Sequence, residues 1–229
     1  MNLLIVASVP VFIILAYVYY RDRYEREPLK LLIEGLVAGG VIVFPVIYFE
    51  NLMHQLGVNL TGLGAAAWTA FMVAALIEEL FKFFAVYVLI WKNPEFNEMF
   101  DGVVYAVFVS LGFALVENIG YVFGSETGIT VGLLRAFTAV PAHAMFGVMM
   151  GYRFGLARFI PSKRLKYLGL AFLVPFLFHG VYDFILMSQN QYLVFLFLPF
   201  VFYLLWRSLL RIKQLIPNSA FNPDHHKDD

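Results

Sequence analysis

Long apolar segments alternate with short polar connections along nearly the whole chain. Each segment approaches the roughly 20 residues that an α-helix needs to cross a bilayer, and connections such as RDRYEREPLK and KNPEFNEMFD separate them. The pattern predicts an all-α, polytopic helical bundle of about seven transmembrane helices, with eight as the upper limit. The first segment lacks the basic start and the cleavage site of a secretory signal, so we expect it to be retained as a span. The predicted spans are 2–20, 31–50, 65–91, 102–124, 131–154, 167–188 and 192–210.

Composition supports a membrane protein. Of the 229 residues, 61% are hydrophobic and 14% are charged, and the mean hydropathy is +0.77. Soluble domains carry about 25% charged residues, which they need to cover their surface. These values exclude an ordinary soluble domain, a disordered chain and a nucleic-acid-binding protein with a basic footprint. The chain has no cysteine, so disulfides and thiolate metal sites are excluded. The lipid bilayer is the expected partner, and no nucleic acid is expected.

The positions of the basic residues predict the direction of the chain across the membrane. Of the 16 Lys and Arg residues, 14 lie in alternate connections, at the span ends beside them or in the C-terminal tail, and the other connections hold none. Because basic residues concentrate on the cytoplasmic side, we expect the N-terminus outside and the C-terminus inside. Residues 1–216 then form one transmembrane domain, and residues 217–229 form a short polar cytoplasmic tail.

Ionisable residues also occur inside the predicted spans. Each costs about 2.5–3.5 kcal/mol near the bilayer centre, so such residues are by default candidates for a functional site. Counting inward from the predicted span ends places them on four helices at one depth, between the midplane and the outer leaflet. The candidates are Glu78, Glu79, Lys82, Glu117, His143, His179 and Asp183, accompanied by Asn118.

Spacing along each helix indicates which of these groups can pair. His179 and Asp183 are four residues apart and share a helix face, so one can orient the other. Lys82 follows Glu78 by four residues and Glu79 by three, so both carboxylates can reach the same ammonium. One ammonium cannot fully compensate two carboxylates. A carboxylate left undercompensated next to an imidazole is suited to act as a general base for water.

Several of these residues also have structural interpretations. Lys82 can serve as a counter-ion for the two glutamates. Glu79 can serve either as a partner of Lys82 or as a catalytic group. Asn118 can form a hydrogen bond with the backbone of a neighbouring helix. We expect Arg135, which lies near the outer end of its span, to extend its guanidinium toward the water interface.

The motifs on the four spans resemble those of one known family. Glu78-Glu79-x-x-Lys82, Phe113-x-x-x-Glu117-Asn118, His143 and His179-x-x-x-Asp183 resemble in order the motifs of the PrsW family of bacterial intramembrane proteases. The resemblance covers nearly the whole chain. PrsW proteins resemble in turn the prenyl-protein (CAAX) endopeptidases and the bacteriocin-processing membrane proteases. In that wider group a histidine stands where this sequence has Glu117, and the basic residue after the glutamate pair is an arginine placed one position later.

The resemblance implies a glutamic-type peptidase in the bacterial cytoplasmic membrane, with no cofactor. It implies a first, extracytoplasmic cut in a single-span anti-sigma factor during regulated intramembrane proteolysis. Glu78 is then the general base, with Glu79 and Lys82 setting its charge. His143, His179 and Asp183 orient the water or stabilise the oxyanion, and Glu117 with Asn118 completes the pocket.

Two other functions remain open from the residues alone. Two histidines and several carboxylates at one depth are also ligands that zinc accepts, which would make the chain a zinc-dependent membrane protease. Buried acidic and histidine residues also occur in proton-coupled transporters, although such transporters usually show repeated halves. A purely structural scaffold gives no reason to keep so many charges inside the membrane.

Overall fold

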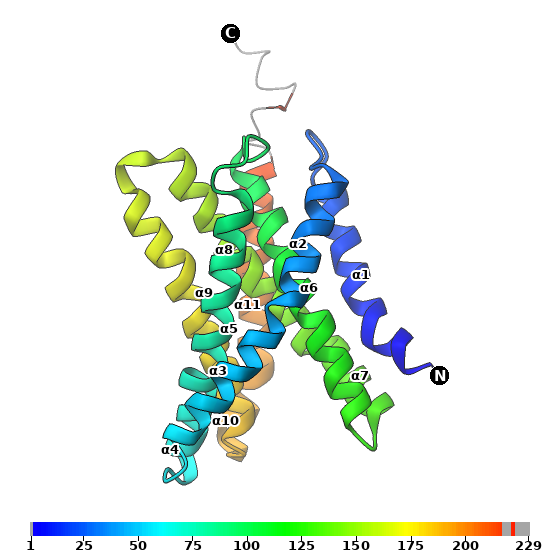
Figure 1. Ribbon diagram of the computed structural model, residues 1–229, viewed down its shortest axis with the longest axis vertical. Coiled ribbons are helices and arrows are strands. Elements are labelled where there is room, and N and C mark those ends of the chain that lie inside the picture. Colours follow the sequence, from blue (N-terminus) through cyan, green and yellow to red (C-terminus); the bar gives the residue numbers. More distant parts are fainter. Residues whose placement is uncertain (1, 217–220, 223–229) are drawn as a thin grey trace.

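The computed structural model describes residues 2–216 and 221–222, and these residues are helical apart from turns and short connections (Figure 1). The predicted polar tail lies outside the described residues except for 221–222. The helices are α1 (Leu3–Arg21), α2 (Leu29–Val41), α3 (Val43–Leu56), α4 (Gly62–Ala67), a π-helix (Trp68–Ala75), α5 (Leu76–Ile90), α6 (Met99–Gly124), α7 (Gly128–Phe137), α8 (Ala139–Phe159), a 3-10 turn (Pro161–Lys163), α9 (Arg164–Met187), α10 (Gln191–Phe195) and α11 (Phe197–Leu215).

The all-α class is confirmed, and so is the presence of several membrane-length helices. Within the described residues, five helical stretches are long and apolar enough to cross a bilayer: Leu3–Arg21, Leu29–Leu56, Met99–Gly124, Gly128–Phe159 and Pro161–Met187. The remaining predicted spans, 65–91 and 192–210, are also helical but are not among the five. The first carries three charged residues in α5, and α11 carries three basic residues. The count of seven and the direction of the chain across the bilayer stay predictions.

Three of the predicted spans are each divided into two helices by a proline. A proline cannot donate a hydrogen bond to the carbonyl four residues earlier, and its ring collides with that carbonyl. In each divided span the first helix ends four residues before a proline. The helix ends are Val41, Phe137 and Phe195, and the matching prolines are Pro45, Pro141 and Pro199.

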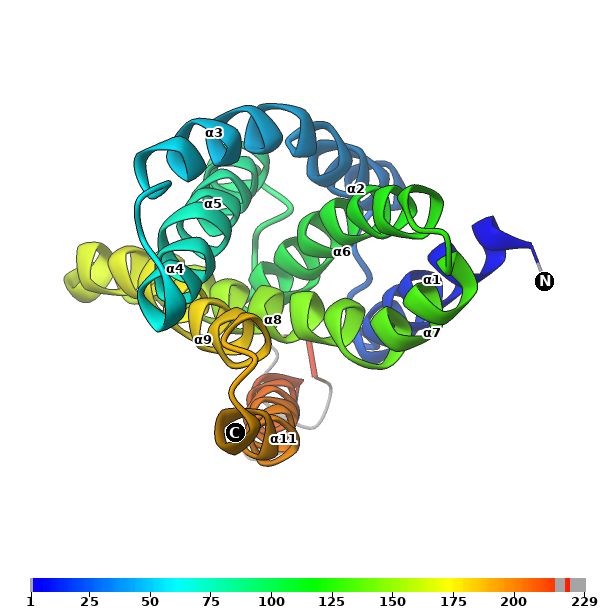
Figure 2. The same cartoon turned by 90° about the horizontal axis from the view of Figure 1, so that it is seen from below.

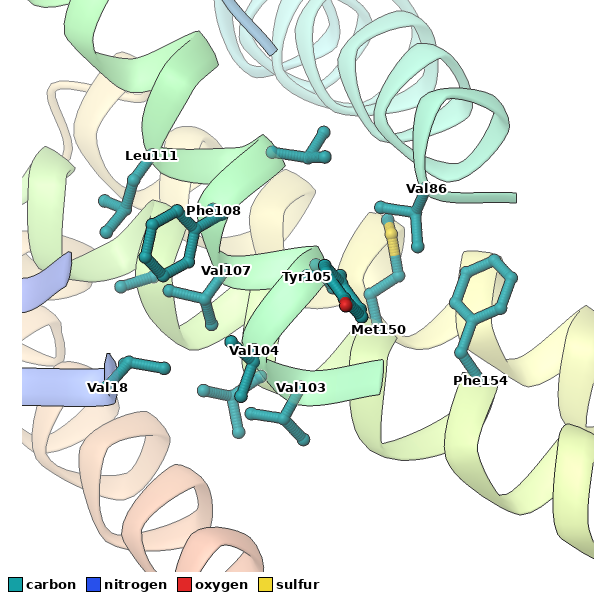
Figure 3. Packing of buried hydrophobic residues seen from close by; sticks show 14 of the residues in the cluster. Val18, Val86, Val103, Val104, Tyr105, Val107, Phe108, Leu111, Met150 and Phe154 are labelled. Carbon is teal, nitrogen blue, oxygen red and sulfur yellow. The ribbon is translucent and has the colours of Figure 1, made fainter. Parts of the chain in front are cut away.

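Helix α6 forms the centre of the bundle. In its most apolar stretch 83% of the residues are buried, compared with 28% for α1. Figure 3 shows Tyr105 and Phe108 of α6 in the same packed cluster as Met150 and Phe154 of α8. Seen along the bundle in Figure 2, α6 and α8 lie inside, and α11 lies at the periphery. A helix buried on every side accounts for the continuous apolar sequence of α6.

Glycines allow α6 to approach its neighbours closely. A Cβ on Gly112 would collide with the backbone carbonyl of Leu36 in α2, and a Cβ on Gly151 of α8 would collide with the carbonyl of Gly102. Small residues at helix interfaces are typical of membrane bundles, because they let the backbones come together. These contacts fix the axial position of α6 relative to α2 and α8.

We expect Gly112→Ala to lower the free energy of unfolding by about 1–3 kcal/mol, the usual cost of overpacking a tight contact. Thermal unfolding of the purified protein in detergent measures the change. Gly120→Ala is the matched control, since a Cβ at Gly120 meets no atom within 4 Å. Equal unfolding temperatures for the two variants would contradict the close contact of α2 with α6.

Candidate active site

The glutamate pair lies at the start of α5, directly after the π-helix. π-helical turns are rare and often occur at functional sites. The ring of Phe71 in the π-helix packs against Gly180 of α9, where a Cβ would collide with it. Gly180 follows His179 in the sequence. The contact therefore holds Glu78 and Glu79 at the same level as His179.

Lys82 is the central cation of the site, and it is fully buried. Its Nζ donates to Glu78 Oε2 at 2.8 Å and to Glu79 Oε1 at 2.9 Å. The same Nζ lies 3.2 Å from His143 Nδ1 of α8 and 4.2 Å from the centroid of the Phe113 ring. With Lys82 as the donor to Nδ1, the imidazole carries its proton on Nε2. Lys82 thus connects α5 to both α6 and α8.

His179 of α9 lies between Glu79 of α5 and Asp183 of its own helix. Its Nδ1 lies 2.9 Å from Glu79 Oε1, and its Nε2 lies 3.3 Å from Asp183 Oδ2. Both ring nitrogens face carboxylate oxygens, an arrangement that is fully satisfied when both nitrogens carry protons. The ring of Phe146 stacks on His179 with centroids 4.9 Å apart and fixes the plane of the imidazole.

A second branch begins at His143. The Nε2 of His143 lies 3.0 Å from Glu117 Oε2, which also accepts a hydrogen bond from Arg135 Nη2 at 2.7 Å. Arg135 Nε donates to Asn118 Oδ1 at 2.8 Å, and Asn118 Nδ2 donates to the carbonyl of Ala7 in α1 at 2.7 Å. The predicted backbone contact of Asn118 with another helix is therefore present.

The structure joins all eight candidate residues, which lie on α5, α6, α8 and α9, into one network of hydrogen bonds and ion pairs that includes Arg135 of α7. The prediction that Arg135 extends toward the interface is wrong, since its side chain is 14% exposed and pairs with Glu117. The proline-induced break before α8 lets α7 run in its own direction beside α6 and brings Arg135 to Glu117. Only Arg135 and Lys82 among the basic residues fall within predicted spans away from the basic connections, a signal that could have placed Arg135 in the site.

The network contains more acidic than permanently basic groups. The network holds four carboxylates, from Glu78, Glu79, Glu117 and Asp183, and two permanent cations, Lys82 and Arg135, so protonation of His179 still leaves one negative charge uncompensated. Glu79 is fully buried, and its Oε1 faces both Lys82 and His179, whereas Glu78 pairs only with Lys82 among the residues that the structure describes. A network of this kind has the proton acceptors and donors that hydrolysis requires.

The site also contains donor atoms that suit a metal ion. One ligand atom from each of Glu78, Glu79 and His179 lies within 4.8 Å of the others. Glu79 Oε2 is buried and has no hydrogen-bond partner among the described residues. Oxygen and imidazole nitrogen donors are those of catalytic zinc sites. The residues therefore fit a metal by type, although an ion there would have to compete with the ammonium of Lys82 for both carboxylates.

Buried carboxylates, imidazoles and an ammonium converging inside an apolar helical bundle define a membrane-embedded enzyme, and comparison with known proteins identifies it as an intramembrane protease. Residues 27–207 match the family described as PrsW family intramembrane metalloprotease. The chain belongs to this family.

Curated relatives agree with the family assignment. The chain is 39% identical to Protease PrsW of Geobacillus kaustophilus, over 88% of this chain and 86% of that protein. It is 35% identical to Protease PrsW of Bacillus subtilis, over 90% and 91% of the two chains, and 36% identical to Protease PrsW of Clostridioides difficile, over 90% and 88%. No solved structure matches the chain. The protein is thus a multi-pass membrane peptidase, and the family assignment favours a protease over a transporter.

Replacing Lys82 by Met should lower the free energy of unfolding by about 3–5 kcal/mol, because breaking a buried ion pair leaves uncompensated charge behind. Adding Glu79→Gln to the same chain removes one of those charges and should recover part of the loss. Thermal unfolding in detergent of the two single variants and the double variant gives the coupling energy. Additive effects of the two substitutions would show that the pair is not energetically linked.

Proposed function

We propose that the protein hydrolyses a peptide bond of a membrane-anchored substrate with a water molecule activated by Glu78. The observation that carries this proposal is that two adjacent buried carboxylates share the ammonium of Lys82. One cation cannot neutralise both, so one carboxylate retains the affinity for a proton that a general base needs.

Glu78 suits the role of the base better than Glu79. The oxygen Glu79 Oε1 has two cationic or imidazole partners, Lys82 and His179, and the Glu79 side chain is fully buried. The Glu78 side chain retains 7% exposure, and among the described residues it pairs with Lys82 alone. Glu79 then anchors Lys82 and His179, while Glu78 accepts a proton from the attacking water.

We assign the two histidines to the oxygen of the tetrahedral intermediate. Because both ring nitrogens of each histidine have partners in the free site, a histidine must exchange one of these partners in order to donate to that oxygen. The rings of His143 and His179 lie 5.6 Å apart and meet nearly edge to face at 84°. Donors held rigidly where negative charge develops are usually the largest contribution to catalysis. Asp183 fixes His179, and Glu117 with Arg135 fixes His143. These two pairs hold the imidazoles in position before substrate binds.

The position of the network supports an extracytoplasmic cut. Glu117 lies seven residues before the end of α6, and His179 lies eight residues before the end of α9. These helix ends are opposite to the connections that carry most of the basic residues. With the basic side in the cytoplasm, the site faces the outer half of the membrane. We propose that the substrate is a single-span anti-sigma factor cut first at this site, in the bacterial cytoplasmic membrane, during regulated intramembrane proteolysis that starts a stress response.

Glu78→Gln should reduce cleavage of a tagged single-span substrate by at least about 100-fold, the smaller end of general-base contributions. Co-expression with each candidate anti-sigma factor of the source organism, followed by immunoblotting of the fragments, measures the loss. The unfolding temperature of Glu78→Gln should stay close to that of the wild type.

Glu34→Gln provides the control, since Glu34 lies exposed on α2, where its partner Lys30 is also exposed. This variant should cleave at the wild-type rate. Cleavage retained by both Glu78→Gln and Glu79→Gln would rule out glutamate-activated water.

A metal-dependent mechanism is the second candidate, because the family description and the grouping of Glu78, Glu79 and His179 both favour it. These residues would hold the ion, which would supply Lewis-acid polarisation of the scissile carbonyl. Lys82 would then have to leave at least one of the two carboxylates. His143 and Glu117 would keep their hydrogen bond and the positioning role described above.

Treatment with 1,10-phenanthroline separates the two mechanisms. With glutamate-activated water, the purified enzyme should cleave its substrate at an unchanged rate after the chelator is removed by desalting. Lost activity that returns on addition of zinc, but not magnesium, would decide for the metal-dependent mechanism. The non-chelating isomer 1,7-phenanthroline is the control for nonspecific inhibition.

A further inference from the structure

A second group of buried acidic residues lies at the other end of α6. The connection between α1 and α2 packs against the start of α6 and brings Glu25 and Glu27 to Asp101. Asp101 precedes Glu117 by 16 residues in the same helix, a separation of about 24 Å at the rise of an α-helix. This acidic cluster, Glu25, Glu27 and Asp101, is therefore separate from the candidate active site.

Each carboxylate of the acidic cluster is held through one of its two oxygens. Asn97 Nδ2 donates to Glu25 Oε1 at 2.9 Å, and the Tyr105 hydroxyl donates to Glu27 Oε2. Asp101 Oδ2 accepts from the backbone N–H of Asn97 at 2.8 Å and from that of the next residue at 2.7 Å. These bonds come from the backbone and from neutral side chains. They orient the carboxylates without neutralising them.

The second oxygen of each carboxylate is buried and, within the described residues, accepts no hydrogen bond from the backbone or from a side chain outside the cluster, although the carboxyl groups of Glu27 and Asp101 lie within hydrogen-bond reach of each other. These atoms are Glu25 Oε2, Glu27 Oε1 and Asp101 Oδ1. Glu27 is 3% exposed and Asp101 is fully buried, so water at the surface does not reach their free oxygens. Buried carboxylate oxygens without partners are costly. Three such atoms, one from each member of a single cluster, indicate a missing electropositive ligand.

No basic side chain of the described residues forms an ion pair with Glu25, Glu27 or Asp101. Within the described part of the chain, the cluster therefore lacks a basic counter-charge.

We propose that Glu25, Glu27 and Asp101 bind a hard divalent cation, Mg²⁺ or Ca²⁺, through one oxygen each. Oxygens from the three residues lie within 4.8 Å of one another, close enough for a common ion. A donor set made only of oxygens favours Mg²⁺ or Ca²⁺ over zinc. The bound cation fastens the α1–α2 connection to the start of α6, and it displaces the proton that the carboxylates would otherwise share.

Terbium luminescence tests this site directly, because Tb³⁺ takes the same oxygen ligands and Tyr105 stands next to Glu27 as the donor of excitation energy. The full chain is purified in detergent, freed of metal with a chelating resin and titrated with Tb³⁺ under tyrosine excitation. We expect saturable emission that Ca²⁺ or Mg²⁺ displaces. Glu27→Gln and Asp101→Asn should weaken Tb³⁺ binding by about tenfold or more.

Two further variants control for misfolding and for nonspecific binding. Glu25→Gln alters the half-buried member of the cluster and should weaken binding while the protein stays folded. Glu34→Gln should behave as the wild type in its Tb³⁺ affinity and in the rise in unfolding temperature that Ca²⁺ or Mg²⁺ gives.

Equal Tb³⁺ affinity in the wild type, Glu25→Gln and Glu27→Gln would overturn the proposal, as would an unfolding temperature that does not respond to Ca²⁺ or Mg²⁺. The carboxylates would then share protons instead of a cation. Neither readout uses proteolysis, so the outcome is independent of the proposed catalytic mechanism.

Discussion

The ammonium of Lys82 is the interaction on which the rest of the site depends. A fully buried lysine is tolerated in an apolar bundle only when anionic partners surround it. Here Glu78 and Glu79 supply the charge, and His143 supplies a neutral nitrogen from another helix. Because these partners come from α5 and α8, the ammonium fixes the distance between two helices as well as the charge of the site. The rest of the network reaches Lys82 by two routes: His179 and Asp183 connect through Glu79, and Glu117, Arg135 and Asn118 connect through His143.

Helix α6 connects the candidate active site to the acidic cluster at the other end of the bundle. Its glycines seat it against α2 and α8, so that its axial position is set by backbone contact. Its far end presents Glu117 to His143 and Arg135, and its near end presents Asp101 to the α1–α2 connection. A rigid, buried helix thus spans both acidic groups. A shift of α6 along its axis would disturb the two ends together.

Much of this arrangement follows from the sequence because lipid makes polar residues costly. Apolar length identified the helical segments, and the ionisable residues inside them identified the members of the site. The sequence did not reveal which segments would divide. Pro10 and Pro175 lie within unbroken helices, whereas α2 and α7 end four residues before Pro45 and Pro141. The position of Arg135 depends on one of those breaks. Its pairing with Glu117 is therefore a tertiary property that spacing along α7 cannot show.

The acidic cluster at the start of α6 could not be predicted from the sequence, for a different reason. Glu25 and Glu27 lie in a charged connection, where acidic residues are ordinarily solvated, and only the packing of that connection on α6 buries Glu27 against Asp101. Lys82 and Arg135, the two basic residues that lie within the predicted spans away from the basic connections, belong to the candidate active-site network. At that end the protein builds its counter-charges into the helices, which keeps them in place without any ligand. At the opposite end the described residues of the acidic cluster provide oxygens alone, and in the proposed site the compensating charge is a cation from the surrounding solution.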